Sequence, residues 1–352
     1  MKGALSHVLD NLTGSRERKV VSETIAISSI KKFHVVSKEV DIRIFPHDNP
    51  EIDIVLQTYE DGPDLAISSE GESIEITVRN QEHGNRSILS IHRYLSCRLT
   101  IKLPRECVEQ WNIQTTSGNV EIEKIVAERL KISSRSGDLK LRDLLIANVN
   151  IKGTSGDMNC EYIKSDKISV SASSGNITLS EVYGDVEGGV TSGNIRAMAI
   201  RGTEVSFQAT SGNVKLHDIQ AEKLVCSATS GSILGENVHV GLLRTKLTSG
   251  DMKFIHFCGQ VVGNSSSGNM KCQMDEIRPL DMTSTSGDIT IHLGGKDLPS
   301  QLDMKTNSGD LVTNLPLRLI RKSNKHITGI MEDGTHPITV QSTSGDLVVY
   351  TK

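Results

Sequence analysis

The sequence predicts an all-β protein, a single-stranded parallel β-helix (β-solenoid) with rungs of about 19 residues each. Two observations predict this class. A Ser-Gly pair followed by Asn, Asp or Ser returns at a nearly fixed interval, as the even spacing of Gly118, Gly137 and Gly156 shows. Between these pairs, apolar residues alternate with polar ones as in strands, without helical spacing. A period of about 20 residues is typical of a chain that coils with one structural unit per repeat.

The Ser-Gly pair predicts the turn of each rung. Glycine accepts a positive φ without steric cost, and the Asn or Asp beside it can hydrogen-bond to nearby backbone. We therefore expect one tight turn at each glycine of the repeat, namely Gly118, Gly137, Gly156, Gly175, Gly193, Gly212, Gly231, Gly250, Gly268, Gly287, Gly309 and Gly345.

The residues between two turns predict two short strands. Apolar residues recur two, four, seven, twelve and fourteen positions after the glycine; after Gly212 they are Val214, Leu216, Ile219, Leu224 and Cys226. The first and last pairs alternate as strands do, and a bend is expected near the seventh position. Two strands cannot bury a face alone, so rungs must stack as parallel sheets around one core. The coiling is expected to be right-handed.

The chain divides into four regions according to where the period of about 19 residues holds. Residues 1–24 show little pattern and are expected to form a flexible N-terminal arm. Residues 25–110 alternate without Ser-Gly turns, which predicts irregular coils that cap the open end of the solenoid. Regular rungs are expected over 111–310, and a C-terminal rung with a cap over 311–352.

Composition bears on the kind of partner, the state of the cysteines and the location of the protein. The net charge is only -4, which gives no general argument for nucleic acid. The cysteines at rung positions, Cys160, Cys226 and Cys272, stand where other rungs have Leu, Ile or Val, so we expect buried free thiols. No signal peptide and no apolar run of about 20 residues is visible. The sequence as it stands predicts a cytoplasmic protein, or one peripheral to the cell envelope, without an integral membrane segment.

Three features of the chain occur together: the alternating segment VDIRIFPHDNPEIDIVLQ, then LTIKLP, then many TSGN and SSGD turns. In this combination the chain resembles a bacterial family of domains of unknown function that carries the label "putative adhesin". The resemblance covers about Ile30 to Val349 and includes LiaG-type members, which are linked to the cell envelope of Gram-positive bacteria. It implies a β-helix with no known catalytic residues.

A broken basic stripe is the candidate binding site. Three positions after the glycine, facing outward, stand Lys140, Arg196, Lys215, Lys253 and Lys271. Such a stripe suits an acidic polymer such as a teichoic acid, or an anionic membrane. The alternative is a charged solvent face that keeps the sheet soluble.

The column after each glycine offers a second candidate. Neighbouring carboxylates such as Asp138 and Asp157 lie one strand spacing apart and have the oxygen ligands that calcium prefers. The alternative is a ladder of turn hydrogen bonds, in which Asn and Asp are interchangeable. We expect the ladder, and therefore neither a metal site nor a cofactor.

The expected function is a non-enzymatic scaffold or interaction protein, adhesin-like and linked to the cell envelope or its stress response. Its partner, an unknown protein or envelope polymer, and its oligomeric state are not indicated by the sequence. The rival function is a carbohydrate-active β-helix enzyme, a polysaccharide lyase or hydrolase. It would need paired carboxylates or an Arg or Lys base in one cleft, where several columns break together in adjacent rungs. No catalytic residue is assigned.

Overall fold

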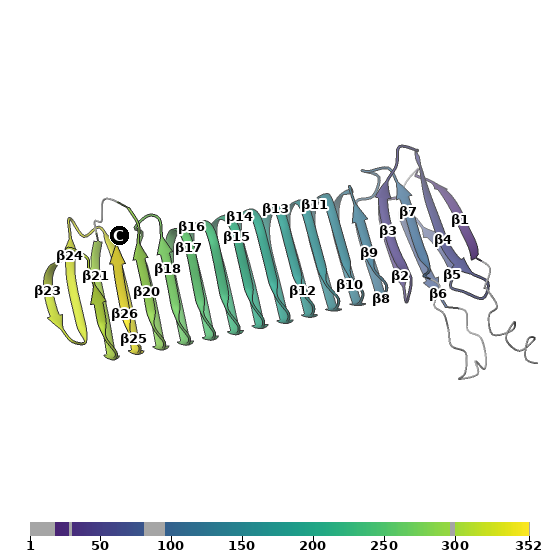
Figure 1. Ribbon diagram of the computed structural model, residues 1–352. Coiled ribbons are helices and arrows are strands. Elements are labelled where there is room, and N and C mark those ends of the chain that lie inside the picture. The colour runs from purple at the N-terminus through teal and green to yellow at the C-terminus, as the bar shows by residue number, and fades with distance from the viewer. Residues whose placement is uncertain (1–17, 28–29, 81–95, 296–299, 352) are drawn as a thin grey trace, which may run out of the picture.

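The computed structural model describes residues 18–27, 30–80, 96–295 and 300–351. Every regular element in these residues is a strand, and the strands form one long row (Figure 1). The predicted all-β class and the parallel stacking of successive coils are both confirmed, with partners such as Asp138 and Asp157 one period apart. Residues 1–17 of the expected N-terminal arm lie outside the described part, and its remainder begins the first strand, β1.

The middle of the row consists of strands that run around almost a whole rung. Each pairs in parallel with the next, as Val214 with Ile233 and Leu224 with Leu243, with a one-residue shift in register where rung length changes. These strands are β10 (Val126–Ser136), β11 (Leu139–Ser155), β12 (Met158–Ser174), β13 (Ile177–Ser192), β14 (Ile195–Ser211), β15 (Val214–Ser230), β16 (Ile233–Ser249) and β17 (Met252–Ser267).

The eight rungs from Gly118 to Gly250 bend at the sixth residue after the glycine. That residue is left-handed without being glycine, with φ between 53 and 56° at Lys124, Asp143, Tyr162, Glu181, Ala199, Asp218, Asn237 and His256. The bend lies one residue before the inward-facing seventh position and separates two outer surfaces. We call positions two to five, such as 195–198, the first face, and positions twelve to seventeen, such as 224–229, the second face.

The Ser-Gly turns are joined by a ladder of side-chain hydrogen bonds. The Asx side chain after each glycine accepts a hydrogen bond from the backbone N–H of its counterpart in the next rung. Asp157 Oδ1, for example, lies 2.9 Å from the nitrogen of Asn176, and Asn213 Oδ1 lies 2.9 Å from that of Ser232. The ladder continues without a gap from Asp41 to Asp310 and explains the Asn/Asp column as turn chemistry.

Removing one side chain of this hydrogen-bond ladder measures how much it contributes to stability. Asn213→Ala is expected to lower the free energy of unfolding by about 1 kcal/mol, because the N–H of Ser232 loses its acceptor. Asn213→Asp keeps the acceptor for Ser232 but loses the Nδ2 donor that lies 3.3 Å from Asn194 Oδ1, so its stability should fall between those of Asn213→Ala and wild type. Urea unfolding of both variants, with the exposed Thr210→Ala as control, checks this. Equal stability of all three proteins would contradict the ladder.

One continuous hydrophobic core runs the length of the described chain, filled mainly by Val, Ile and Leu. Aromatic rings enter it at a few rungs, such as the Phe254–Phe257 pair with centroids 5.7 Å apart. Cys160, Cys226 and Cys272 are buried in it, and all six cysteines are free. Burial raises the pKa of Cys160 and of Cys272 to about 12, so these thiols stay protonated and pack as small hydrophobes.

At the N-terminal end, the first rung in sequence is not the outermost in space. Its two strands lie between later ones: β2 between β6 and β8, and β3 between β7 and β9. Outside them, β5, β4 and β1 add antiparallel edges. The strands are β1 (Arg18–Ala26), β2 (Lys32–Ser37), β3 (Asp41–Pro46), β4 (Glu51–Tyr59), β5 (Asp64–Glu70), β6 (Ser73–Arg79), β7 (Arg98–Leu103), β8 (Gln110–Ser117) and β9 (Val120–Glu123).

The C-terminal end is interleaved in the same way. The last rung in sequence is inserted, with β25 between β19 and β21, and β26 between β20 and β22. An antiparallel hairpin, β24 and β23, forms the outer edge (Figure 1). The strands are β18 (Met270–Met274), β19 (Leu280–Ser286), β20 (Ile289–Leu293), β21 (Ser300–Ser308), β22 (Leu311–Thr313), β23 (Arg318–Ser323), β24 (His326–Met331), β25 (His336–Ser344) and β26 (Leu347–Thr351).

Candidate binding surface

The structure brings together four of the five predicted stripe residues. On the first face, Arg196 of β14 pairs with Lys215 of β15, and Lys253 of β17 pairs with Lys271 of β18. Leu234 of β16 stands between Lys215 and Lys253. Arg196, Lys215, Lys253 and Lys271 are all exposed, and we call them, with Leu234, the basic column.

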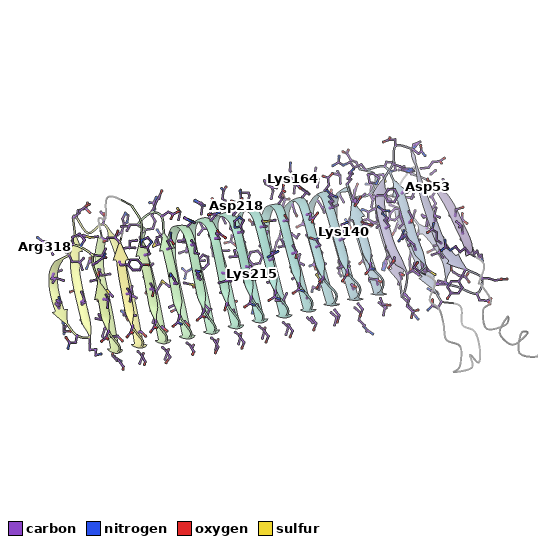
Figure 2. All side chains as sticks on the ribbon, viewed as in Figure 1. Asp53, Lys140, Lys164, Lys215, Asp218 and Arg318 are labelled. Carbon is purple, nitrogen blue, oxygen red and sulfur yellow. The ribbon has the colours of Figure 1, made fainter. Side chains whose placement is uncertain are left out.

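Lys140 lies apart from this column, closer to the N-terminal end of the row (Figure 2). Asn159 and Thr178 separate it from Arg196 along the stack. Its Nζ is 3.4 Å from a carboxylate oxygen of Glu121 in the preceding rung. Lys140 therefore shares the Glu121 carboxylate with Arg43, whose Nε lies 3.1 Å from its other oxygen.

The cations of the basic column are distinguished by their shared position in neighbouring rungs. Some other cations pair with an acid in an adjacent rung, as Lys223 does with Glu204 at 3.0 Å and Arg201 with Asp218 at 2.9 Å. Within the part of the chain that the structure describes, no acid lies within 4.0 Å of the four cations of the column. Two pairs of unmatched cations in one column, with only Leu234 between them, produce a positive potential that attracts anions.

An apolar floor accompanies the charge. A shallow depression of about 500 Å³ is lined by Arg196, Lys215 and Lys253 around Met198, Leu234 and Ile255. Met198 is 43% exposed and Leu234 36%. His217 and Glu236 line the same depression and lie 3.6 Å apart. The surface therefore offers cations at its rim and hydrocarbon between them, which suits a polymer that carries anionic groups on an organic backbone.

A small cluster of polar side chains lies at the bend of β17. His256 and Asp275 are 3.3 Å apart, and Cys258 follows two residues along the strand. Burial, then the charges of Glu276 and Asp275, raise the pKa of Cys258, which keeps this thiol protonated and a poor nucleophile. Among the described residues, no group of three or more His, Cys, Asp or Glu side chains could hold a metal ion. No helix in the described chain is long and apolar enough to cross a membrane.

Reasoning from the sequence missed two exposed tyrosines, Tyr162 and Tyr183, on the bends of β12 and β13. Tyr162 is the left-handed bend residue of its rung, and Tyr183 lies two residues after the bend residue Glu181. The shortened interval between Gly175 and Gly193 was a signal in the sequence, because it marks a rung with one residue fewer.

These observations define the class: a parallel β-solenoid with a Ser-Gly-Asx turn in each rung and a charged outer face. The chain belongs to the Toastrack DUF4097 family, whose model matches residues 30–202 and 190–350. A comparison with curated proteins found no match.

The chain also matches several solved structures. A "putative cell adhesion protein" of Clostridium sporogenes is 11% identical with a TM-score of 0.21, covering 96% of this chain and 100% of its own. A "putative adhesin" of Bacteroides fragilis is 12% identical with a TM-score of 0.25, covering 95% and 97%. A "putative lipid binding protein" of Parabacteroides distasonis is 16% identical with a TM-score of 0.34, covering 76% and 96%.

Proposed function

We propose that this protein is a non-enzymatic, adhesin-like scaffold of the bacterial cell envelope, in the manner of LiaG-type proteins, that binds an anionic envelope polymer. The observation that carries the proposal is the basic column, in which two pairs of stacked cations flank Leu234 and no acid of the described chain lies within 4.0 Å of any of the four. A rigid solenoid holds these charges at a spacing of about 4.8 Å per rung, so binding does not require ordering of the protein. A phosphodiester polymer such as a teichoic acid offers anionic groups in series to such a column.

A carbohydrate-active enzyme is the less favoured function. Columns do break at β12 and β13, where Asp166 and Glu181 line a depression. However, Asp166 is exposed and Glu181 is hydrogen-bonded by Tyr162. A glycosidase needs one carboxyl group in an enclosed apolar environment as general acid, beside a second that acts as nucleophile or base. Neither carboxylate has such an environment.

Charge reversal tests the proposed function. The double variant Lys215→Glu/Lys253→Glu is expected to bind poly(glycerol phosphate) teichoic acid roughly tenfold or more weakly than wild type. Binding of the wild type should weaken as salt rises, because exposed charges are screened. Biolayer interferometry at low and physiological salt measures both effects.

The matched control is Lys152→Glu/Lys246→Glu, which makes the same change at two exposed lysines of the second face. It should bind within about twofold of wild type, since the charges lie on the other face. Equal losses in the two double variants would show a non-specific charge effect and contradict the proposal. Binding to anionic lipid vesicles but not to the polymer would replace the polymer by a membrane.

A further inference from the structure

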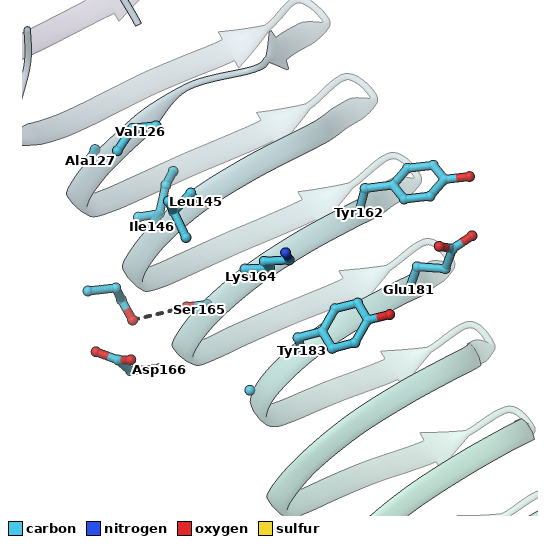
Figure 3. A pocket seen from close by; sticks show the side chains of 12 residues that line it. Val126, Ala127, Leu145, Ile146, Tyr162, Lys164, Ser165, Asp166, Glu181 and Tyr183 are labelled. Atoms are coloured by element: carbon cyan, nitrogen blue, oxygen red, sulfur yellow. Dashed lines mark hydrogen bonds between the residues drawn. The ribbon is translucent and has the colours of Figure 1, made fainter. Parts of the chain in front are cut away.

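A second depression, of about 850 Å³, lies at the bends of β11, β12 and β13, away from the basic column (Figure 3). Tyr162 and Tyr183 project outward there from neighbouring coils and are 47% and 49% exposed. They are the only aromatic residues of the described chain among its large exposed hydrophobic side chains. In a sequence with 3% aromatic residues, two such rings on adjacent rungs form an unusual surface feature.

A local change in the length of the rungs produces this recess. Lys164 pairs with Tyr183 and Lys167 with Asp185, so two residues of β12, Ser165 and Asp166, face one residue of β13, Gly184. Gly184 has φ of 131°, and a Cβ there would collide with the carbonyl oxygen of Ser165. The corner of β13 therefore lies directly against that of β12, and Tyr183 comes just before this contact.

Hydrogen bonds hold the corner in place. Ser165 Oγ lies 3.0 Å from the carbonyl oxygen of Ala147 and 2.9 Å from that of Lys167. Its neighbours on the core side, such as Ile163 and Ile168, are buried. The recess is therefore a fixed part of the solenoid.

The side chains around the two rings are mixed in character and balanced in charge. The Tyr162 hydroxyl is hydrogen-bonded to Glu181, which raises the pKa of Tyr162. Arg142 lies 5.9 Å from the ring centre of Tyr162, and Lys164 lies 5.9 Å from that of Tyr183. Asp166 and Glu181 offset these two cations. Leu145, 49% exposed, extends the apolar surface along the stack.

We propose that this recess, which we call the tyrosine recess, binds a neutral saccharide chain. A sugar ring presents apolar C–H groups to an aromatic face and hydroxyl groups around its edge. The lining of the recess offers aromatic surface from both tyrosines, a donor (Lys164) and acceptors (Asp166, Glu181), and Arg142 borders it over the ring of Tyr162. With Arg142 included the charges balance, which gives no preference to an ionic ligand. A protein segment would need a larger continuous apolar surface than two tyrosines and one leucine provide.

The geometry also suits a chain rather than a single sugar. Leu145, Lys164 and Tyr183 form one column across three rungs. Successive rungs are about 4.8 Å apart, which is comparable to the length of one sugar residue. A saccharide that lies along the solenoid axis would therefore meet one rung with each of its units.

Binding of defined oligosaccharides to the full chain tests this inference. Chitohexaose, cellohexaose and mannohexaose are titrated by calorimetry, and the strongest binder is then measured with variants. Tyr183→Ala should weaken binding about tenfold or more, and Tyr183→Phe should retain most of it, because the ring face is kept. Tyr162→Ala, at the other ring, gives an independent second measurement should Tyr183→Ala fold poorly. Met198→Ala, at a side chain 43% exposed in the basic depression, is the matched control and should have no effect.

Three outcomes would overturn the inference. They are no binding of any of the three oligosaccharides at millimolar concentration, equal binding by Tyr183→Ala and Tyr162→Ala to that of wild type, and loss of teichoic acid binding instead of oligosaccharide binding in these variants. Because the basic column is unchanged in all of them, teichoic acid binding by Tyr183→Ala separates this inference from the proposed function.

Discussion

Gly212→Val is expected to lower the free energy of unfolding by roughly 3 kcal/mol or more. Gly212 has φ of 144°, a conformation that valine avoids. A Cβ at this position would also collide with the carbonyl oxygen of Gly193 in the preceding rung. The neighbour is backbone and cannot rotate away, so the two rungs must separate and weaken the ladder on both sides. Urea unfolding followed by circular dichroism measures the loss.

Gly189→Val is the matched control for this change. Gly189 lies in the same solenoid, in β13, with no atom within 4 Å of the position of an added Cβ. Valine favours strands, so this variant should be as stable as wild type or slightly more stable. If Gly212→Val had the stability of Gly189→Val, the turn would not need glycine and the explanation of the repeat would be wrong.

Deletion of residues 335–352 is the second change with a large expected effect. It is expected to destabilise strands beyond the residues removed. The deletion takes away β25 and β26, which lie between the Gly287 rung and the strands β21 and β22. Without them, β21 to β24 lose the strands that join them to the stack. Buried side chains of β19 and β20, such as Met282 and Ile291, become exposed at a new edge.

Limited trypsin digestion with mass spectrometry measures this effect. In the full chain Lys305 lies within β21, paired on both sides, and should be cleaved slowly. In the truncated chain, Lys305 and the basic residues of β23 should be cleaved at least ten times faster. Their strands no longer have to leave a packed sheet before trypsin can reach them, so local unfolding costs less free energy. Wild-type protection of residues 300–331 after truncation would contradict the interleaved order and favour a simple sequential stack.

The regular part of the fold could be predicted because its determinants are local and repeated. The apolar positions after Gly212, and the Ser-Gly-Asx turn itself, specify strand, turn and rung length within one period. The bend was less visible. It occupies a left-handed position held by residues as different as Tyr162, Glu181 and Ala199, because the stacked ladders on either side impose the conformation. No residue preference marks it in the sequence.

The order of strands at the two ends could not be predicted. Whether β26 stacks beyond β22 or between β20 and β22 depends on which arrangement covers the exposed edges, a property of the whole molecule. The long interval before Gly345 showed that the period fails there, without showing where the last rung returns. The division of the chain into four regions stays a prediction for the same reason.

The candidate site was predictable only as far as the period reaches. Counting three positions from each glycine found every cation of the basic column. The pairing of Lys140 with Glu121, the apolar floor at Met198 and the tyrosine recess depend on side chains from two or three rungs at once. These features became visible only when the rungs were placed side by side.

Lysine footprinting in the presence of poly(glycerol phosphate) tests the central claim most directly. The full chain is acetylated with and without the polymer, and the labelling of each lysine is compared by mass spectrometry. The proposed function predicts that Lys215, Lys253 and Lys271 are protected together, while Lys152 and Lys246 of the second face label as before. Uniform protection of both faces, or protection confined to lysines outside the basic column, would contradict it.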